Sequence, residues 1–282
     1  MESPLRLFLG HHKCATTWIN SILFQVCSDL ALKFFNATNP GMFESDIQAF
    51  TNKERIDFLA FTNANYAYLR NIEHFRGFHV IRDPRDIVVS AFFSHTYSHS
   101  TEDWPALVEH RKKLKRVSKD EGLMLEIKFN RPGLERLYTW NYTNPNILEI
   151  RMEEMISHPY ETMLAAMTHL DMVKDDRSYR SSSAYLLGSV FSRLHTKSRG
   201  MFPFRSFNKR IPAQFLLGYV YQNRFSSKTS GREPGQEDAE SHYRKGVAGD
   251  WVNHFNGDHK RYFKDQYNEL LLKLGYEDSP DW

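Results

Sequence analysis

The sequence predicts an α/β fold with a central parallel β-sheet that carries helices on both faces. Short apolar runs typical of buried strands alternate with longer segments whose apolar residues recur at helical spacing. This alternation indicates right-handed βαβ crossovers, which place the strands in parallel and the helices against the sheet. Ligands of such sheets bind at the carboxyl ends of the strands, so the residues that follow each strand are the first candidates for function.

Five apolar runs predict the strands of this sheet. They are residues 5–9, 32–35, 56–61, 78–81 and 147–150. Apolar residues from Trp18 to Leu30 recur at helical spacing with polar residues on the other side, which predicts an amphipathic helix. Further helices are expected from Pro159 and near the C-terminus, where Gly275 is the residue type that commonly follows the end of a helix.

Composition limits the classes of function. The 282 residues carry 37 basic and 34 acidic side chains, a formal net charge of +3, which argues against binding of nucleic acid or another bulk polyanion. The two cysteines, Cys14 and Cys27, imply no disulfide framework and fit a reducing compartment. The sequence shows no signal peptide or membrane-spanning stretch, so we expect a soluble cytoplasmic protein.

The segment from Gly10 to Trp18, which joins the first strand to the first helix, is the most informative part of the chain. Backbone N–H groups at a helix start have no partner within the helix, and the helix dipole favours negative charge there. Lys13, Thr16 and Thr17 at this turn therefore predict a site for a phosphate-like group. The segment is not a Walker A loop, which ends in Gly-Lys-Ser/Thr, because here the lysine precedes the small residue Ala15.

Two further segments carry residue types that bind anions. Arg82 directly follows the strand at 78–81, with Ser90 eight residues later, and a guanidinium can bind phosphate bidentately while a hydroxyl adds a donor. Near the C-terminus, Arg244 and Lys245 precede Gly246, where a missing side chain permits close backbone approach to an anion. The three segments together point to a ligand with more than one anionic group.

In this order the segments resemble the donor-binding motifs of the sulfotransferases that use 3′-phosphoadenosine 5′-phosphosulfate (PAPS). The 5′-phosphosulfate loop of that family usually reads Pro-Lys-Ser-Gly-Thr-Thr-Trp, and here His12, Cys14 and Ala15 replace the Pro, Ser and Gly. The Arg82 segment resembles the family's 3′-phosphate segment, and residues 244–251 resemble its Arg-Lys-Gly-x-x-Gly-Asp-Trp segment. The resemblance implies a P-loop-like α/β fold and an enzyme of the sulfotransferase class.

The resemblance also implies how the donor binds. The 5′-phosphosulfate would be held by Lys13, Cys14, Ala15, Thr16 and Thr17, the 3′-phosphate by Arg82, Ser90, Arg244, Lys245 and Gly246, and the adenine ring by Trp18 and Phe225. Lys13 would also bridge the leaving oxygen and the transferring sulfuryl group. The donor would leave as adenosine 3′,5′-bisphosphate (PAP), and this family requires no metal ion for the chemistry.

The general base departs from the family's pattern. In the cytosolic members a histidine follows the strand that precedes the arginine segment, whereas residues 61–66 here contain no base. The candidates that remain are His12 first, then His11, His95, Glu44 and Asp46. The acceptor would be a small molecule, glycan or lipid with a hydroxyl or amine group, and the sequence fixes neither its identity nor the oligomeric state.

The remaining features concern organisation and metal binding. We expect a single domain over residues 1–282, with residues 175–222 as a helical insertion that shapes the acceptor pocket and residues 226–241 as a lid loop. His95 and His99 have the spacing of helical zinc ligands, but no further ligand accompanies them, so we expect no metal. The basic residues at 111–119 are interpreted as a solvated helix face or as a rim that attracts an anionic acceptor.

Two rival functions stay open. A P-loop kinase or nucleotidase on a similar fold would need magnesium with ATP or GTP, and the missing Gly-Lys-Ser/Thr ending counts against it. A catalytically degenerate relative that binds PAP and acts as a scaffold would need no general base. The absence of the family's histidine at residues 61–66 is consistent with that second rival.

Overall fold

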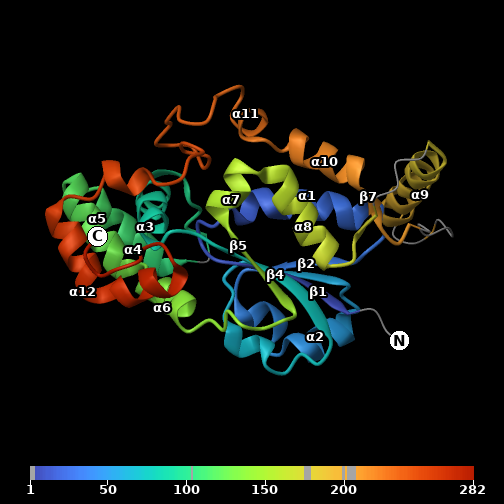
Figure 1. Ribbon diagram of the computed structural model, residues 1–282, viewed down its shortest axis with the longest axis horizontal. Helices are drawn as coiled ribbons and strands as arrows, with labels where there is room; N and C mark the ends of the chain where they lie inside the picture. The colour runs from blue at the N-terminus through green and yellow to red at the C-terminus, as the bar shows by residue number, and fades with distance from the viewer. Residues whose placement is uncertain (1–3, 103, 175–178, 199–200, 202–207) are drawn as a thin grey trace. The chain divides into compact units, whose positions relative to one another are not determined.

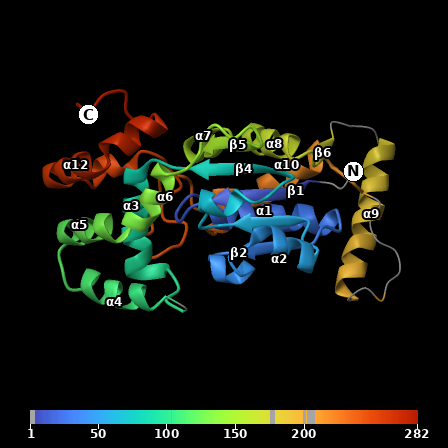
Figure 2. The ribbon, with the colours of Figure 1, turned by 90° about the horizontal axis from the view of Figure 1, so that it is seen from below.

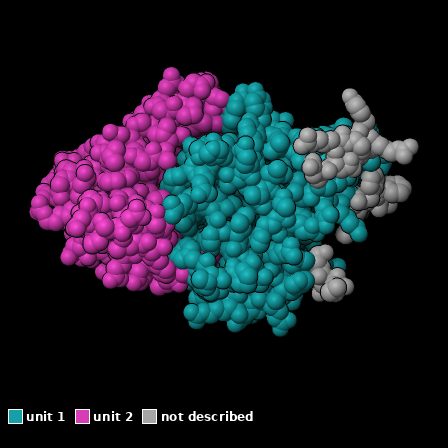
Figure 3. Space-filling model, in the orientation of Figure 1, with its two compact units in different colours: residues 1–11, 15–81, 141–224 teal, residues 12–14, 82–140, 225–282 magenta. Residues whose placement is uncertain are grey.

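The computed structural model describes residues 4–102, 104–174, 179–198, 201 and 208–282, and the chain forms two compact units. Unit 1 consists of residues 1–11, 15–81 and 141–224, and unit 2 of residues 12–14, 82–140 and 225–282 (Figure 3). The expectation of one sulfotransferase domain over residues 1–282 stays a prediction.

Unit 1 contains the central sheet, and the predicted fold class is confirmed. Its five parallel strands have the order β2-β3-β1-β4-β5. The strands are β1 (Leu5–Gly10), β2 (Phe34–Ala37), β3 (Phe58–Phe61), β4 (Phe75–Ile81) and β5 (Ile147–Arg151). β2 and β3 each begin two residues later than expected, because Lys33 and Asp57 bond each other ahead of the ladder: the Lys33 backbone N–H donates to the Asp57 carboxylate at 2.8 Å.

Helices cover both faces of this sheet. Figure 1 shows α1 (Thr16–Asp29) and α8 (Pro159–His169) on one face and α2 (Ile47–Glu54) on the other. Every residue of β3 is buried, as expected for a parallel strand with helices on both sides. The short helix α7 (Met152–Ser157) follows β5 directly, and the 3₁₀ turns Pro40–Phe43 and Tyr66–Leu69 complete the connections.

The described part of the expected helical insertion contains α9 (Tyr179–Lys197) and α10 (Ala213–Gln222). The strand β6 (Val173–Lys174) precedes this region and pairs in parallel with β7 (Ile211–Pro212), which lies between the two helices. The role of the region as an insertion that shapes an acceptor pocket stays a prediction. Residues 175–178, 199–200 and 202–207 of the predicted insertion lie outside the described residues. Along the described part of the chain, no helix has the length and apolarity that crossing a bilayer requires.

In the described residues of unit 2, the regular elements are helices and helical turns. Its elements are α3 (Pro84–Phe93), the π-helical turn η3 (Ser94–Ser98), α4 (Pro105–Leu114), α5 (Lys119–Phe129), α6 (Arg131–Tyr138), α11 (Phe225–Lys228), the 3₁₀ turn η4 (Asp250–Asn253) and α12 (Gly257–Leu274). Ser118 and Glu121 form a capping box at the start of α5, and Gly275 ends α12 with a φ of 66°, as its sequence position indicates.

The segment predicted to be a lid is organised around one arginine. α11 occupies its first residues, and Arg232 then donates hydrogen bonds to the carbonyl groups of Gln236, Tyr243 and Arg244 at 2.8–3.0 Å. These bonds fix the polar segment to the Arg244 segment within unit 2. Closure of the segment over a ligand stays a prediction.

The turn before α1 contains a residue with an unfavourable backbone conformation. Ala15 caps α1 with a φ of 56° and a ψ of 19°, in the left-handed region that an L-residue other than glycine enters at a cost of roughly 1–2 kcal/mol. The resemblance places glycine at this position. Ala15 therefore adopts this turn at a conformational cost that glycine would avoid.

We expect Ala15→Gly to stabilise the protein by about 0.5–1 kcal/mol, because relief of the left-handed strain exceeds the added chain entropy of glycine. Urea unfolding curves would measure this change. The matched control is Ala166→Gly, inside α8, which should destabilise by about 1 kcal/mol or more. Equal destabilisation by both variants would contradict the argument.

Candidate functional site

In unit 2, the buried side chain of Arg82 binds the backbone of Lys13. Its Nη1 atom donates to the Lys13 carbonyl oxygen at 3.0 Å, and its Nη2 atom lies 3.9 Å from the Asp86 carboxylate. Asp86 in turn accepts backbone hydrogen bonds from Gly249 at 2.6 Å and Trp251 at 2.9 Å. All three anion-binding segments that the sequence singled out thus meet through Arg82 and Asp86.

Positive charge is concentrated around Lys13. Burial first, and then the nearby Arg82 guanidinium, lower the pKa of Lys13 to about 7, with Arg244 acting in the same direction and Glu126 against it. Burial and then Lys13 also lower the pKa of His242. The cations Arg82 and Arg244 both disfavour the charged form of Lys13, so an anion beside it would be stabilised and would restore its proton.

Arg244 and Lys245 are held by a buried carboxylate. Asp250 accepts from Arg244 Nη2 at 2.5 Å and from Lys245 Nζ at 2.6 Å. Burial alone would raise the pKa of Asp250, but the hydrogen bonds, first that of Lys245, outweigh it and hold the pKa well below its usual range. Arg244 also bonds Glu237 at 2.6 Å. The two basic side chains of the predicted 3′-phosphate clamp are therefore positioned by acidic partners.

Gly246 and Phe225 lie in contact in unit 2. Gly246 has a φ of 69°, and a Cβ atom built there would come within 2.6 Å of the Phe225 ring. The positive φ and the close approach of the Phe225 ring both require glycine at position 246. The Arg232 guanidinium lies 5.5 Å from the centre of the same ring, and Ser90 is half-buried on α3. Stacking of Phe225 on adenine stays a prediction.

In unit 1, the N-terminus of α1 presents the threonines of the predicted loop. The helix begins at Thr16, no side chain caps it, and its first turn holds no acidic residue. These properties suit an anion. The Trp18 indole is engaged nearby, where its Nε1 donates to the Asn223 carbonyl at 2.9 Å. A role of Trp18 at adenine stays a prediction.

His12 begins a chain of hydrogen bonds in unit 2. Its Nε2 atom lies 2.9 Å from Nε2 of His95, whose Nδ1 lies 2.8 Å from the Glu126 carboxylate. His110 Nε2 contacts the second Glu126 oxygen at 2.8 Å, and Asn130 Nδ2 donates to Glu126 at 2.5 Å. Glu126 is fully buried, so this carboxylate can only be satisfied by these side chains.

The charges along this chain follow from its contacts. Burial alone would raise the pKa of Glu126, but hydrogen bonds from His110 and His95 outweigh burial and lower it, so Glu126 is a carboxylate. Burial, and then Lys13, lower the pKa of His12 well below its usual range. His12 is consequently neutral, as a general base must be before it accepts a proton.

His11 begins a second chain of the same kind in unit 1. Its Nε2 lies 2.7 Å from Nε2 of His79 on β4, and His79 Nδ1 lies 2.6 Å from the Glu149 carboxylate on β5. Burial lowers the pKa of His79 to about 3. His11 is 3% exposed, whereas His12 is half-buried. Accessibility therefore favours His12 over His11 as the base.

Three further residues that the sequence singled out have partners nearby. In unit 1, Glu44 pairs with Lys53 at 3.1 Å and Asp46 caps α2, and a role of either as the base stays a prediction. Arg111 is not part of a solvated face, because it donates to the carbonyl groups of His95 and His99 at 2.5 Å and fixes the π-helical turn. The two carbonyl groups that accept these hydrogen bonds belong to His95 and His99, which have the spacing of helical zinc ligands.

The grouping with metal-ligand geometry in the described part of the chain is a different one. It comprises His95, His110 and Glu126. Both carboxylate oxygens already accept hydrogen bonds from the two imidazoles, so a hydrogen-bond network accounts for these side chains. Burial and then His95 lower the pKa of His99 to about 4.

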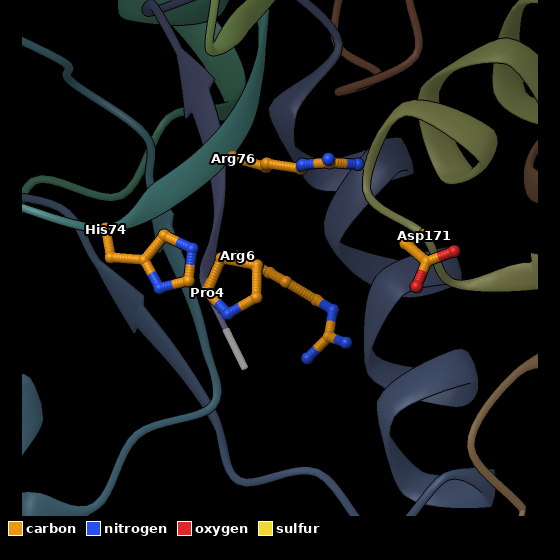
Figure 4. Close-up of a pocket in the computed structure, with 5 residues that line it drawn as sticks. All are labelled: Pro4, Arg6, His74, Arg76 and Asp171. Atoms are coloured by element: carbon orange, nitrogen blue, oxygen red, sulfur yellow. The ribbon is translucent and has the colours of Figure 1, made fainter. Parts of the chain in front are cut away.

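A pocket of about 380 Å³ in unit 1 lies at the amino ends of β1 and β4. Its lining comprises Pro4, Arg6, His74, Arg76 and Asp171. Figure 4 shows both arginine side chains extending toward Asp171. The predicted functional residues follow the opposite, carboxyl ends of the same strands, so this pocket is separate from them.

Solved structures share the fold of this chain. The mouse sulfotransferase SULT7A1 complexed with PAP is similar with a TM-score of 0.50 and 18% identity, over 96% of this chain and 85% of that chain. Retinol dehydratase in complex with androsterone and inactive cofactor PAP is similar with a TM-score of 0.51 and 13% identity, over 96% and 82%. This chain has the sulfotransferase fold. No protein-family model and no curated protein matches it.

Sequence reasoning missed four residues of the two histidine chains. His79, Glu149, Glu126 and His110 carry no motif. For Glu149 a signal was available, because a carboxylate in the middle of an apolar strand needs a partner. Nothing in the helical sequence around Glu126 distinguishes it from an ordinary surface glutamate.

Lys13 should reduce stability, because its charge is buried among other cations. Its pKa falls from 10.5 in the unfolded chain to about 7 in the folded one, so the folded state binds fewer protons. The penalty is complete below pH 7 and is relieved as pH rises toward 10. We expect Lys13→Met to raise the free energy of unfolding by about 1–3 kcal/mol near pH 6, with a smaller gain near pH 9.5.

Urea unfolding at the two pH values measures this difference, with the exposed Lys113→Met as control. The control should stay within about 0.5 kcal/mol at both pH values. A loss of stability in Lys13→Met would show that the Lys13 charge is compensated in the fold.

Proposed function

We propose that this protein is a sulfotransferase that moves the sulfuryl group of PAPS to a hydroxyl or amine of an acceptor. The observation that carries the proposal is the hydrogen bond from Arg82 to the Lys13 carbonyl, with the positive charge around it. It unites within unit 2 two motifs that lie far apart in the sequence and that both resemble donor-binding segments. The PAP complexes of two proteins with this fold agree with a bisphosphate ligand.

The residues present fit such a donor. A lysine with a lowered pKa, a buried arginine and a glycine with positive φ are donors for anionic oxygen. Lys13 would contact the leaving 5′-phosphate oxygen, and Arg82, Ser90 and the Gly246 backbone would bind the 3′-phosphate. In unit 1, Thr16 and Thr17 would bind the 5′-phosphate at the start of α1.

The transfer step exchanges one sulfur–oxygen bond for another. The acceptor oxygen forms a bond to sulfur while the bond from sulfur to the 5′-phosphate oxygen breaks, and PAP leaves with that electron pair. Lys13 neutralises the charge that develops on the leaving oxygen, as in phosphoryl transfer. The proton of the acceptor hydroxyl passes to a base, for which His12 is the candidate.

The hydrogen-bond chain fixes the tautomer that this role requires. Glu126 accepts from His95 Nδ1–H, which leaves a lone pair on His95 Nε2. His95 Nε2 then accepts from His12 Nε2–H, so the lone pair of neutral His12 is on Nδ1. Nδ1 is therefore the atom that would take the proton from the acceptor.

The hydrogen-bond chain from His12 through His95 to Glu126 would also move the positive charge that His12 gains away from Lys13. A cation on His12 is disfavoured by Lys13, one of the groups that lower its pKa. When Nδ1 gains a proton, the Nε2 proton can pass to His95, where the cation lies 2.8 Å from the Glu126 carboxylate. Glu126 and His95 thus position His12 and stabilise the product of its protonation.

Fewer observations bear on the class of acceptor. The fold neighbour that contains androsterone is called a dehydratase, so the fold alone fixes neither the acceptor nor the reaction class. We propose a hydroxyl-bearing small molecule, with glycan or lipid acceptors as alternatives, and a cytoplasmic location, which a chain with only two cysteines fits.

A thermal-shift titration tests the donor site. PAP at a hundred times its dissociation constant should stabilise the protein by about 2.7 kcal/mol without magnesium. Arg82→Ala should weaken PAP binding by about 2–3 kcal/mol and barely change the affinity for adenosine 5′-phosphosulfate, which has no 3′-phosphate. The exposed Arg116→Ala is the matched control and should bind both ligands normally.

Two outcomes would count against this assignment. Stabilisation only by ATP with magnesium would favour the kinase alternative. Equal losses of both ligands in Arg82→Ala would mean that Arg82 acts only by holding the Lys13 backbone.

His12→Ala should lower the turnover number by about 10²–10⁴-fold, because the proton of the acceptor then has no base. The affinity for PAP should stay within about threefold, and Glu126→Gln should lower turnover and shift its pH profile, because it removes the partner of protonated His95. His158→Ala, at an exposed position in unit 1, is the control. Unchanged turnover in His12→Ala, measured with an acceptor found by screening phenols, alcohols and sugars, would refute this role.

A further inference from the structure

α9 lies in a stretch of unusual charge. Between positions 177 and 224 the sequence holds nine lysines and arginines and no aspartate or glutamate, although the whole chain has a net charge of only +3. This stretch of the sequence therefore carries basic residues without acidic ones. Figures 1 and 2 show α9 at the periphery of this unit, away from the five-stranded sheet.

The orientation of α9 reverses the usual amphipathic pattern. The face that packs on the body of unit 1 is partly polar: Tyr185 donates to the Asp29 carboxylate at 2.8 Å, Ser192 donates to the Ser28 carbonyl, and Ser189 is buried. The opposite face is apolar. It presents Leu186, Leu187, Val190 and Leu194, with exposures of 44–53%.

A helix of a water-soluble protein normally turns its apolar face inward. Here the polar groups anchor the helix through buried hydrogen bonds, so rotation of α9 to hide the leucines would break them. The outward apolar stripe, defined as Leu186, Leu187, Val190 and Leu194, is thus maintained by the packing of the helix. Such a stripe marks an interaction surface.

Exposed basic residues that follow α9 in the chain indicate an anionic partner. Lys209 and Arg210, which follow α9 in the chain, are exposed, and Arg210 pairs with Asp171 at 2.5 Å. An apolar stripe within a sequence stretch that has basic but no acidic residues is typical of helices that lie in the interface of an anionic bilayer, where the leucines enter the acyl boundary and the basic residues meet the headgroups.

We propose that α9 docks unit 1 on the surface of a membrane that contains anionic lipid. The apolar stripe provides the buried area, and the surrounding lysines and arginines provide attraction that falls with salt. This inference does not rest on the proposed sulfotransferase activity, because no residue of the stripe belongs to the donor site.

Co-sedimentation of the whole protein with vesicles tests the inference. We expect binding to vesicles of phosphatidylcholine mixed with phosphatidylserine, weaker binding to phosphatidylcholine alone, and weakening by salt. The double variant Leu187→Asp with Val190→Asp should bind about tenfold or more weakly. Lys209→Glu should weaken binding about fivefold or more.

Leu272→Asp is the matched control, because it makes the same change at an exposed leucine on α12 in unit 2. It should bind vesicles like the unmodified protein. Urea unfolding of each variant should match the unmodified protein, since all the changed side chains are exposed; Lys209→Glu tests the inference separately if the double variant fails to fold.

Several results would overturn the inference. These are absence of binding to phosphatidylserine vesicles, equal loss in Leu272→Asp, and full binding by the double variant. Light scattering provides a further test: a dimer in solution that the double variant converts to a monomer, without vesicle binding, would assign the stripe to contact between two copies of the chain.

Discussion

The candidate site depends on the hydrogen bond that the buried Arg82 guanidinium donates to the Lys13 carbonyl. Residues 12–14 are the only part of the segment between β1 and α1 that belongs to unit 2, and Arg82 holds them there through the Lys13 carbonyl. His12 adds a hydrogen-bond contact with His95 and ring contacts with His99 and Trp104. These contacts fix a three-residue segment whose side chains, Lys13 and His12, are the proposed chemical groups.

Holding Lys13 beside Arg82 has an electrostatic consequence. Burial first, and then the nearby Arg82 guanidinium, lower the pKa of Lys13 to about 7, so the charged form of Lys13 is disfavoured in the folded protein. Three carboxylates of unit 2 offset the positive charge of this site. Asp86 faces Arg82, and Asp250 binds Arg244 and Lys245. Glu126 binds His95. Each carboxylate orients a basic group instead of neutralising Lys13 itself. Such an arrangement is typical of a site whose balancing charge arrives with the ligand.

The sequence predicted those parts of the molecule that depend on local pattern. The parallel sheet, α1, α8 and α12 follow from apolar periodicity. β2 and β3 begin at Phe34 and Phe58, two residues later than predicted, and Lys33 and Asp57 just ahead of them are joined by backbone and side-chain hydrogen bonds. The Lys13 and Arg82 segments were found because their residue types follow strand ends. The buried partners were not found, because Glu126, His110 and His79 acquire their roles from contacts across long sequence separations. The outward stripe of α9 was missed because periodicity identifies an apolar face but not the direction in which it points.

Two adjacent histidines show why geometry has to complete a motif. His11 and His12 each contact a second histidine through Nε2 and, through it, a glutamate, so residue types alone cannot rank them. Their surroundings differ. His11 is buried in unit 1 against His79, whose pKa near 3 makes it a poor site for a second proton. His12 is half-buried and next to Lys13 in the chain, and its partner His95 adjoins a carboxylate that His110 and Asn130 keep ionised. A proton accepted at His12 would therefore have a favourable place to go, whereas one accepted at His11 would not, and this difference supports the proposal of His12 as the base.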